Sequence, residues 1–522
     1  MHSSIRRDIA LIAVLTLLLY GLVEFRARTK LQYTQPSPIL ADSPENEAVG
    51  SLGDDYRDVA GGGKGAYPTS NPSALHYHKS SSYKSKHRNL GKVVGNLSSK
   101  EQHRLALLRR FPPTELIKHA PGFTILDNVY LYNGTLYIVR TDTFPNTFPE
   151  PRLMISNGAA TGGSSSNSEP TDTDMQIINA TQAIHMFGER AFRVQGTSFL
   201  SYDSAQLFAN SFHEVLFSLW RTYASLDPRI TEIGQTSLAS PSRFILPHVS
   251  SKGWRNDHAD MNQYVFRTGL PSTALEFDHT WVDRAETGRA FVFDRVVLGD
   301  RLAAGRGEDK DGWGTMLSQV DKIDGASKWW WEPVRRNVVG EGKTNERDVV
   351  ITYVTRQASG GRRMLKDEDH TRLVAGLRGL EKTYGWEVNV VVMENLKLEE
   401  KIALAARTTI LMGVHGEGLT SLLWMRPSSK STIMEFFAPE GISYDFQYPA
   451  KMLGIRHYGF WDKTAWTEPN VPRKSDFKHN GTPVGFSGMD IPIDADAVVK
   501  LCIERLIPPS AGPLTVDAAA TP

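Results

Sequence analysis

The stretch Ile410–Trp424, ILMGVHGEGLTSLLW, decides how the rest of the chain is interpreted. It begins as an apolar run typical of a buried strand, turns through residues 413–418, and continues as an apolar segment that could begin a helix. A strand, a glycine-rich turn and a helix N-terminus form a natural anion cradle, because glycine lets the backbone approach a ligand and free N–H groups face it. His415 adds a proton donor. The pattern predicts a site for the diphosphate of a sugar nucleotide; the alternative is a tight turn that needs glycine for its geometry alone.

Strand and helix patterns alternate regularly around this stretch. The predicted strands are Asp348–Thr355, Glu387–Met393, Ile410–Gly413, Ser431–Phe437 and Arg456–Phe460, and the predicted helices are Asp367–Tyr384, Leu398–Arg407 and Tyr448–Leu453. Such alternation predicts an α/β fold with a parallel, doubly wound sheet. Ligands bind at the carboxyl ends of the strands in these sheets, so we expect Arg356, the His415 turn and Glu435 to converge.

The basic loop RQASGGRR, residues 356–363, follows the first of these strands. A diphosphate needs bidentate cations and backbone donors, which Arg356, Arg362 and Arg363 could supply together with the glycine turn. Arginine can also stabilise a leaving group in place of a metal ion, so no metal or other cofactor is expected. Glu435 is predicted to accept hydrogen bonds from ribose hydroxyls, with a solvated charge at a strand end as the alternative. The signatures G-x-G-x-x-G, G-x-x-x-x-G-K and H-E-x-x-H do not occur, which argues against NAD, P-loop and zinc-protease sites.

The N-terminal half of the chain offers candidates for a second side of the site. Asn210–Tyr223 has apolar residues at helical spacing, and His213 and Glu214 lie near the predicted start of that helix. Glu214 could complement the helix dipole, or the two residues could be a catalytic or acceptor-binding pair. The run Trp329–Trp331 is predicted to fill a seam between domains, with stacking on a sugar as the alternative. Asn133-Gly134 predicts a hairpin turn.

Two D-x-D tripeptides imitate the metal-binding motif of one class of glycosyltransferase. Residues 172–174 lie in a Ser/Gly/Asp-rich segment, which predicts a loop. Residues 494–496 precede an apolar-periodic run, which predicts a helix N-cap. Neither is expected to bind a metal.

The whole chain has 522 residues, enough for two or three domains, and a net charge of +1, which provides no electrostatic field for collecting nucleic acid. Its single cysteine, Cys502, excludes an intrachain disulfide. We expect a cytoplasmic tail at residues 1–8, a transmembrane signal-anchor at 9–24 and a disordered stem at 25–110, with a cleaved signal peptide as the alternative to the anchor. An N-terminal lobe at 111–340, a C-terminal nucleotide-sugar-binding lobe at 341–510 and a tail at 511–522 complete the predicted organisation.

Four N-x-S/T sequons, at Asn96, Asn133, Asn179 and Asn480, fit a luminal body. The short N-terminal flank favours a single-pass type II orientation over its reverse, although basic residues on both sides of the span leave the charge rule ambiguous.

The segment Asp348–Asp369, the following GVHGEGLTSLLWMRP and the strand IMEFF resemble glycosyltransferase family 61, and most closely its fungal members. The family includes plant β-1,2-xylosyltransferase and the EGF-domain O-GlcNAc transferase. The resemblance covers about residues 122–460. It implies two Rossmann-like lobes of the GT-B type facing a cleft, a UDP-sugar donor in the C-terminal lobe and inversion at the anomeric carbon. It also implies a type II membrane protein of the endoplasmic reticulum or Golgi that acts on a glycan or glycoprotein acceptor.

Residue by residue, the resemblance assigns donor binding to Arg356, Arg362, Arg363, His415, Gly416, Gly418 and Glu435. Glu417 stands where the family commonly has alanine, and a carboxylate there would repel a diphosphate. It could point away, bond the sugar, change donor choice or abolish activity. Xylose and N-acetylglucosamine are the sugars that the resemblance favours.

Two alternatives of other classes remain. The first is a membrane-tethered protein that binds a carbohydrate or nucleotide sugar and has lost catalysis. The second is an esterase, because H-G-x-G can form an oxyanion hole. The esterase requires a G-x-S-x-G elbow, and the nearest match, residues 485–489, ends in methionine in place of the final glycine.

Overall fold

A computed structural model of the chain describes residues 111–140, 148–158, 168–188, 190–252, 254, 261–307, 316–340, 349–357, 362–473, 476, 488 and 490–507. All of them belong to one compact unit, Ser85–Pro522. The predicted cytoplasmic tail, signal-anchor, stem and C-terminal tail lie outside the described residues. Within the described ranges, no helix combines the length and the apolar character needed to cross a bilayer.

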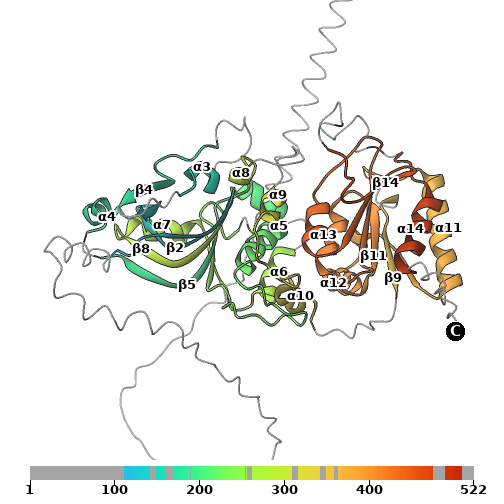
Figure 1. The fold of residues 1–522 in the computed structure, drawn as a ribbon, viewed down its shortest axis with the longest axis horizontal. Coiled ribbons are helices and arrows are strands. Elements are labelled where there is room, and N and C mark those ends of the chain that lie inside the picture. The colour runs from blue at the N-terminus through green and yellow to red at the C-terminus, as the bar shows by residue number, and fades with distance from the viewer. Residues whose placement is uncertain are drawn as a thin grey trace, which may run out of the picture. The chain divides into compact units, whose positions relative to one another are not determined.

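The first sheet is mixed (Figure 1). Its strands are β1 (Glu115–Ala120), β2 (Phe123–Tyr132), β3 (Thr135–Arg140), β4 (Met175–Asn179), β5 (Phe192–Ser201), β6 (Arg243–Ile245), β7 (Ala274–Glu276) and β8 (Phe291–Gly299). The order is β4-β3-β2-β8-β5-β6-β7, with β1 added to β2. Strands β8, β5, β6 and β7 are parallel, whereas β2 is antiparallel to both of its neighbours β3 and β8. Only part of this sheet therefore has the Rossmann-like order, and the GT-B arrangement stays a prediction.

Helices cover both faces of the first sheet. They are α3 (Pro151–Met154), α4 (Ala180–Phe187), α5 (Ala205–Ala224), α6 (Met261–Gly269), α7 (Asp278–Glu286), α8 (Arg301–Ala304), α9 (Met316–Asp321) and α10 (Glu332–Val339). On one face, α5 packs Leu216 and Leu219 into the same apolar cluster as Phe199 and Val297 of the sheet. On the other face, Trp281 of α7 packs in a second apolar cluster with Leu200 and Leu298. These two strand residues follow Phe199 and Val297 directly, so their side chains point to the opposite face of the sheet. The predicted hairpin at Asn133-Gly134 is confirmed as the turn between β2 and β3.

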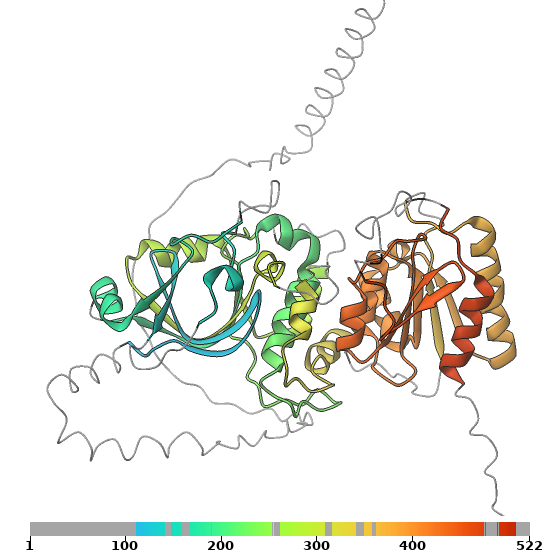
Figure 2. The same ribbon diagram turned by 45° about the horizontal axis from the view of Figure 1, so that its top comes forward.

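The second sheet has the order β10-β9-β11-β12-β13-β14. Its strands are β9 (Val350–Val354), β10 (Glu387–Val391), β11 (Ile410–Val414), β12 (Thr432–Phe436), β13 (Arg456–Trp461) and β14 (Thr464–Trp466). The first five are parallel and β14 is antiparallel, so the predicted parallel sheet is confirmed. Helices α11 (Asp367–Tyr384) and α14 (Ala495–Leu506) cover one face (Figure 2). The other face carries α12 (Leu398–Arg407), the 3-10 helix η6 (Glu417–Trp424) and α13 (Gln447–Met452), and the 3-10 turn η5 (Met393–Asn395) follows β10.

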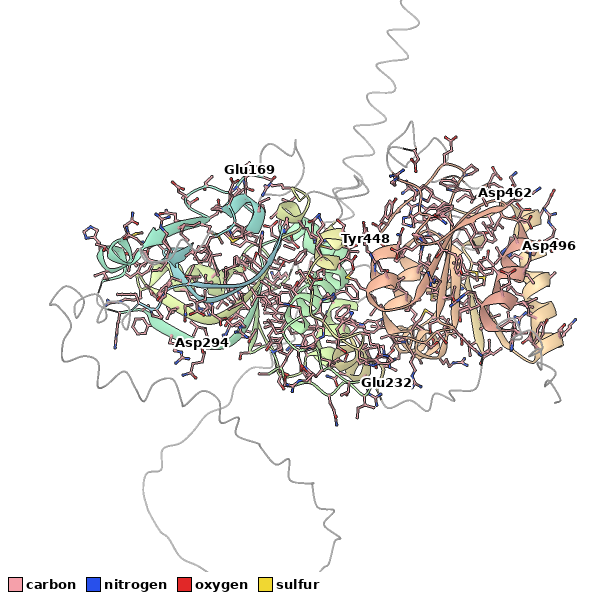
Figure 3. All side chains as sticks on the ribbon, in the orientation of Figure 1. Glu169, Glu232, Asp294, Tyr448, Asp462 and Asp496 are labelled. Atoms are coloured by element: carbon pink, nitrogen blue, oxygen red, sulfur yellow. The ribbon has the colours of Figure 1, made fainter. Side chains whose placement is uncertain are left out.

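One apolar cluster runs from α5 beneath the first sheet to η6 and α13 on the second. Trp330 and Trp331 lie within it: the Trp330 ring N–H donates to the carbonyl of Met452 at 2.7 Å, and that of Trp331 donates to Leu423 at 2.9 Å. Figure 3 labels Tyr448 of α13, another buried member of the cluster. The prediction that the tryptophan run fills a seam between the two halves is therefore confirmed, and Trp330 and Trp331 are too deeply buried to stack on a sugar.

Candidate functional site

The second sheet reverses its direction of winding between β9 and β11. From β9 the chain continues to β10 on one side, whereas β11 continues to β12 on the other. The carboxyl ends of β9 and β11 therefore flank a crevice, which is where ligands bind in open parallel sheets. Arg356 follows β9 by two residues, and His415 follows β11 directly.

The glycines of the turn after β11 have different neighbours. A Cβ atom on Gly413 would lie 2.8 Å from the carbonyl oxygen of Val354, and one on Gly418 would lie 2.8 Å from the Val354 Cγ1. These two positions need glycine because the turn lies against β9. A Cβ on Gly416 would instead lie 2.5 Å from a guanidinium nitrogen of Arg356. Because the first N–H groups of a helix have no partner inside it, the start of η6 directly after Gly416 adds backbone donors beside this cation.

His415 is buried and lies between two carboxylates. Its Nδ1 lies 2.5 Å from Oε1 of Glu435, and its Nε2 lies 3.8 Å from Oδ2 of Asp445. Its ring also stacks on Phe437, with 5.5 Å between the ring centroids. The Glu435 carboxylate thus fixes the orientation of the imidazole.

Glu435 is fully buried, and both of its oxygens are used by histidines. His415 bonds Oε1, and Nε2 of His457 lies 2.8 Å from Oε2. Burial raises the pKa of Glu435, but the hydrogen bonds from His415 and His457 outweigh it and leave that pKa below its ordinary value. The prediction that Glu435 accepts from a ribose does not fit this geometry, because a ribose could not reach the carboxylate. Glu435 is instead a positioning residue for His415.

The three predicted arginines lie near one another. Nη1 of Arg363 donates to the carbonyl oxygen of His415 at 3.3 Å. Burial lowers the pKa of Arg363, and the positive charges of Arg356 and Arg362 lower it further. Arg362 itself is exposed and Arg356 is half-buried. Mutual repulsion among these cations would be relieved by a multiply charged anion, which is the property that a diphosphate site requires.

A cavity of about 250 Å³ lies beside the turn that follows β11, and we call it the first pocket. Its lining includes Arg363, His415, Gly416 and Glu417 from the second sheet and Glu214 from α5. The structure therefore brings these five sequence-predicted residues together. Ligand pockets usually measure about 300–1,000 Å³, so this one would enclose part of a nucleotide sugar.

Glu214 faces the first pocket from the middle of α5. The helix begins at Ala205, not near Asn210, so Glu214 lies too far inside it to complement the dipole at its start. Nη1 of Arg301 lies 3.4 Å from the Glu214 carboxylate, and the same guanidinium bonds the buried Asp203 at 2.9 Å. Asp203 and Arg301 thus orient Glu214 toward the pocket.

Other predicted residues lie apart from the pocket or outside the described side chains. His213 belongs to α5, but its side chain lies outside the described part of the structure. Asp174 stands in a turn, where its carboxylate accepts hydrogen bonds from the Thr171 N–H and hydroxyl. Asp494 caps α14, as predicted. Among the described residues, no cluster of three His, Cys, Asp or Glu side chains could hold a metal ion.

Sequence reasoning missed several residues of the first pocket. Asp445 and Phe446 come from the segment before α13, Thr420 from η6, and Phe217 from α5. Asp445 is half-exposed and follows no strand or helix pattern, so no sequence signal marks it. Phe217 lies among the apolar residues of α5, and the sequence pattern does not distinguish it from residues of the apolar core.

Residues 315–432 match the family model for glycosyltransferase 61. This part of the chain, less than a quarter of it, is similar to glycosyltransferase family 61. The matched residues run from just before α9 to the first residue of β12 and contain Arg356, Arg362, Arg363 and the His415 turn. Glu214, Glu435 and Asp445 lie outside them. The family 61 resemblance expected from the sequence is confirmed, and with it a domain of the transferase class. Among curated proteins, none matches this chain.

Two sequons lie in the described part of the chain, outside the residues that match the family model. Asn133 is exposed at the tip of the β2–β3 hairpin. Asn179 caps α4 and accepts a hydrogen bond from the Gln182 N–H through its side-chain oxygen. Asn96 and Asn480 lie outside the described residues.

Proposed function

We propose that the protein is an inverting glycosyltransferase that moves a sugar from a UDP-sugar to a glycan or glycoprotein acceptor. The observation that supports this most is the first pocket, where Arg363 and the glycine turn, both in the segment that matches family 61, meet the Glu214 carboxylate from the N-terminal half of the chain. Cations suit the diphosphate, and the opposing carboxylate suits the acceptor.

In this proposal the donor diphosphate lies over the turn after Gly416. Arg356 and Arg363 bind its oxygens, and their charge stabilises the leaving group as the bond to the anomeric carbon breaks. Charge-assisted hydrogen bonds contribute roughly 1.5–3 kcal/mol each, so two or three of them would supply much of this stabilisation without a metal ion. His415 directs Nε2 to the same pocket, with its ring held by Glu435.

Inversion needs a general base within about 3 Å of the acceptor hydroxyl. The base takes the hydroxyl proton as the acceptor oxygen attacks the anomeric carbon from the side opposite the leaving UDP. Glu214 is our candidate, because it lines the first pocket and Arg301 holds its carboxylate in place. His213, its neighbour in α5, is the second candidate.

Donor binding is tested by thermal unfolding of the full-length chain with UDP-sugars in the presence of EDTA. We expect UDP-sugars to raise the melting temperature and Arg356→Ala to remove the shift, because losing one charge-assisted bond weakens binding roughly tenfold or more. Arg229→Ala, which removes a well-exposed arginine elsewhere, is the matched control. Unchanged melting with every nucleotide sugar would contradict the proposal.

The role of Glu214 is tested by Glu214→Gln. We expect turnover to fall about 10²–10⁴-fold, as for other general bases, while the UDP-induced melting shift remains. Equal losses of turnover and UDP binding would show that Glu214 acts in donor binding and not as the base.

We also propose that xylose or N-acetylglucosamine is transferred, and that the body lies in the lumen of the endoplasmic reticulum or Golgi behind a signal-anchor at residues 9–24. The family resemblance supports the sugars, and the apolar run with the four sequons supports the location. Hydrolysis of a panel of UDP-sugars by the purified protein would identify the donor.

A further inference from the structure

A second cavity, of about 420 Å³, lies beside the starts of β12 and β13, whereas the first pocket lies beyond the end of β11. Its walls come from the serine-rich segment before β12, from α13, from the start of β13 and from α14. We call it the second pocket. None of the residues assigned to donor binding or catalysis lines it.

The second pocket is rich in positive charge. Lys451, Arg456 and Arg505 line it, and Glu468 is its acid. The Lys451 ammonium pairs with Asp321 at 2.8 Å and lies 3.7 Å from Glu468. Arg456 is exposed at its mouth. Three cations against the two carboxylates of Glu468 and Asp321 leave an excess of positive charge, which favours an anionic ligand.

Two buried side chains of the second pocket have polar atoms without a partner. Gln447 and His457 are 4% and 7% exposed, and neither Oε1 of Gln447 nor Nδ1 of His457 has a hydrogen bond within the described structure. The Thr467 hydroxyl, which also lines this pocket, is likewise buried without a hydrogen-bond partner in the described structure. Native proteins rarely leave such groups unsatisfied, so a partner is expected in the cavity.

The hydrogen-bonding character of these atoms indicates which groups the ligand has. Because Nε2 of His457 bonds the Glu435 carboxylate, it holds the proton in the neutral ring, and Nδ1 is then an acceptor. The Gln447 Oε1 is an acceptor as well. Acceptors require donors, which hydroxyl groups supply, whereas the cations require negative charge.

We propose that the second pocket binds a small hydroxylated phosphate ester, of the chemical class of sugar phosphates. Arg456, Arg505 and Lys451 bind the phosphate, and Gln447 and His457 accept hydrogen bonds from the hydroxyls. The pocket is separate from the first, so this ligand is not the nucleotide-sugar donor.

The test is isothermal titration of the full-length chain with glucose 1-phosphate, inorganic phosphate and glucose, in the presence of saturating UDP. We expect glucose 1-phosphate to bind most tightly and glucose at least tenfold more weakly. Arg456→Glu should weaken binding of the two phosphates at least tenfold. Lys382→Glu, a charge reversal at an exposed lysine of α11 that does not line the second pocket, should leave it unaltered.

Gln447→Leu provides a second readout. It should weaken glucose 1-phosphate more than inorganic phosphate and should raise the melting temperature of the ligand-free chain, because it removes a buried acceptor that lacks a donor. The proposal would be overturned if Arg456→Glu bound glucose 1-phosphate as tightly as the wild type does. It would also be overturned if the wild type did not bind glucose 1-phosphate at millimolar concentration. Complete competitive displacement of glucose 1-phosphate by saturating UDP would also overturn it, since the ligand would then occupy the first pocket.

The second pocket is connected to the first through buried hydrogen bonds. His457 bonds Glu435, which bonds His415 in the first pocket. A ligand that donates a hydrogen bond to His457 should therefore change the affinity for UDP by about fivefold or more. This consequence rests on the proposed function. Failure of UDP to bind would contradict that function alone, and UDP affinity unaffected by glucose 1-phosphate would contradict the connection alone.

Discussion

Glu417 puts a negative charge at the start of η6, beside the proposed diphosphate. It is exposed and lines the first pocket. A like charge about 4 Å away costs about 1 kcal/mol at the dielectric constant of water, and the N–H groups and arginines nearby have to outweigh it.

Removing this charge should strengthen donor binding. We expect Glu417→Ala to tighten UDP binding roughly fivefold, the equivalent of about 1 kcal/mol. Isothermal titration measures the change, with Glu399→Ala on the exposed side of α12 as the control. Weaker binding after Glu417→Ala would mean that the carboxylate bonds the donor.

Glu435 should make stability depend on pH. Its pKa is lower in the folded protein than the ordinary value, so its contribution is present above the ordinary value and is lost as pH falls through the folded pKa. We expect the free energy of unfolding to fall on acidification below about pH 4.5, and to fall less steeply in Glu435→Gln. Urea unfolding between pH 3 and pH 7 measures this. Parallel curves for the two proteins would contradict the assignment.

Glu435 was predicted at the correct position in the sheet but with a different role. The end of β12 was expected to hold Glu435, and it does. Its burial between two histidines comes from β13 and from the turn after β11, which lie 22 and 20 residues away in sequence. Strand periodicity does not reveal contacts across strands, so the sequence could not distinguish a ribose ligand from an internal carboxylate.

At the scale of elements, regular patterns were reliable where they were long. Helices α11 and α12 have the predicted bounds. The start of α5 was misplaced by five residues: the helix begins at Ala205, and Phe208 already stands at helical spacing with Phe212. The apolar segment after the glycine turn forms a 3-10 helix, η6, a distinction that local sequence does not make.

The tryptophan run before α10 should stabilise the contact between the halves. Trp330→Phe removes the donor to the carbonyl of Met452, which is then left buried without its partner, and we expect a loss of about 1–3 kcal/mol. Trp329→Phe should cost less, because that ring is only half-buried and contacts the Lys328 ammonium. Urea unfolding of both variants checks the order. Equal losses would contradict the role given to Trp330.

At the scale of the whole molecule, the luminal location can be tested through glycosylation. When the full-length chain is expressed in a eukaryotic secretory pathway, we expect endoglycosidase to increase its gel mobility. Asn133→Asp should reduce that change, because it removes the exposed hairpin sequon while aspartate still tolerates the turn. Asn395→Asp, outside any sequon, should not. Mobility that the enzyme does not alter would contradict a luminal body.

The sequence by itself determined the second sheet, the glycine turn after β11 and the cations that follow β9, because strand and helix periods and glycine turns are local properties of the chain. It also predicted the resemblance to glycosyltransferase family 61, which the match over residues 315–432 confirms. Only the tertiary structure decided that Glu214 meets Arg363 and His415 in one pocket, that Glu435 is an internal partner of two histidines, and that a second, basic pocket lies beyond His457. The physical reason is that these contacts join segments far apart in the chain, and they form only when the sheets and their helices bury a common core.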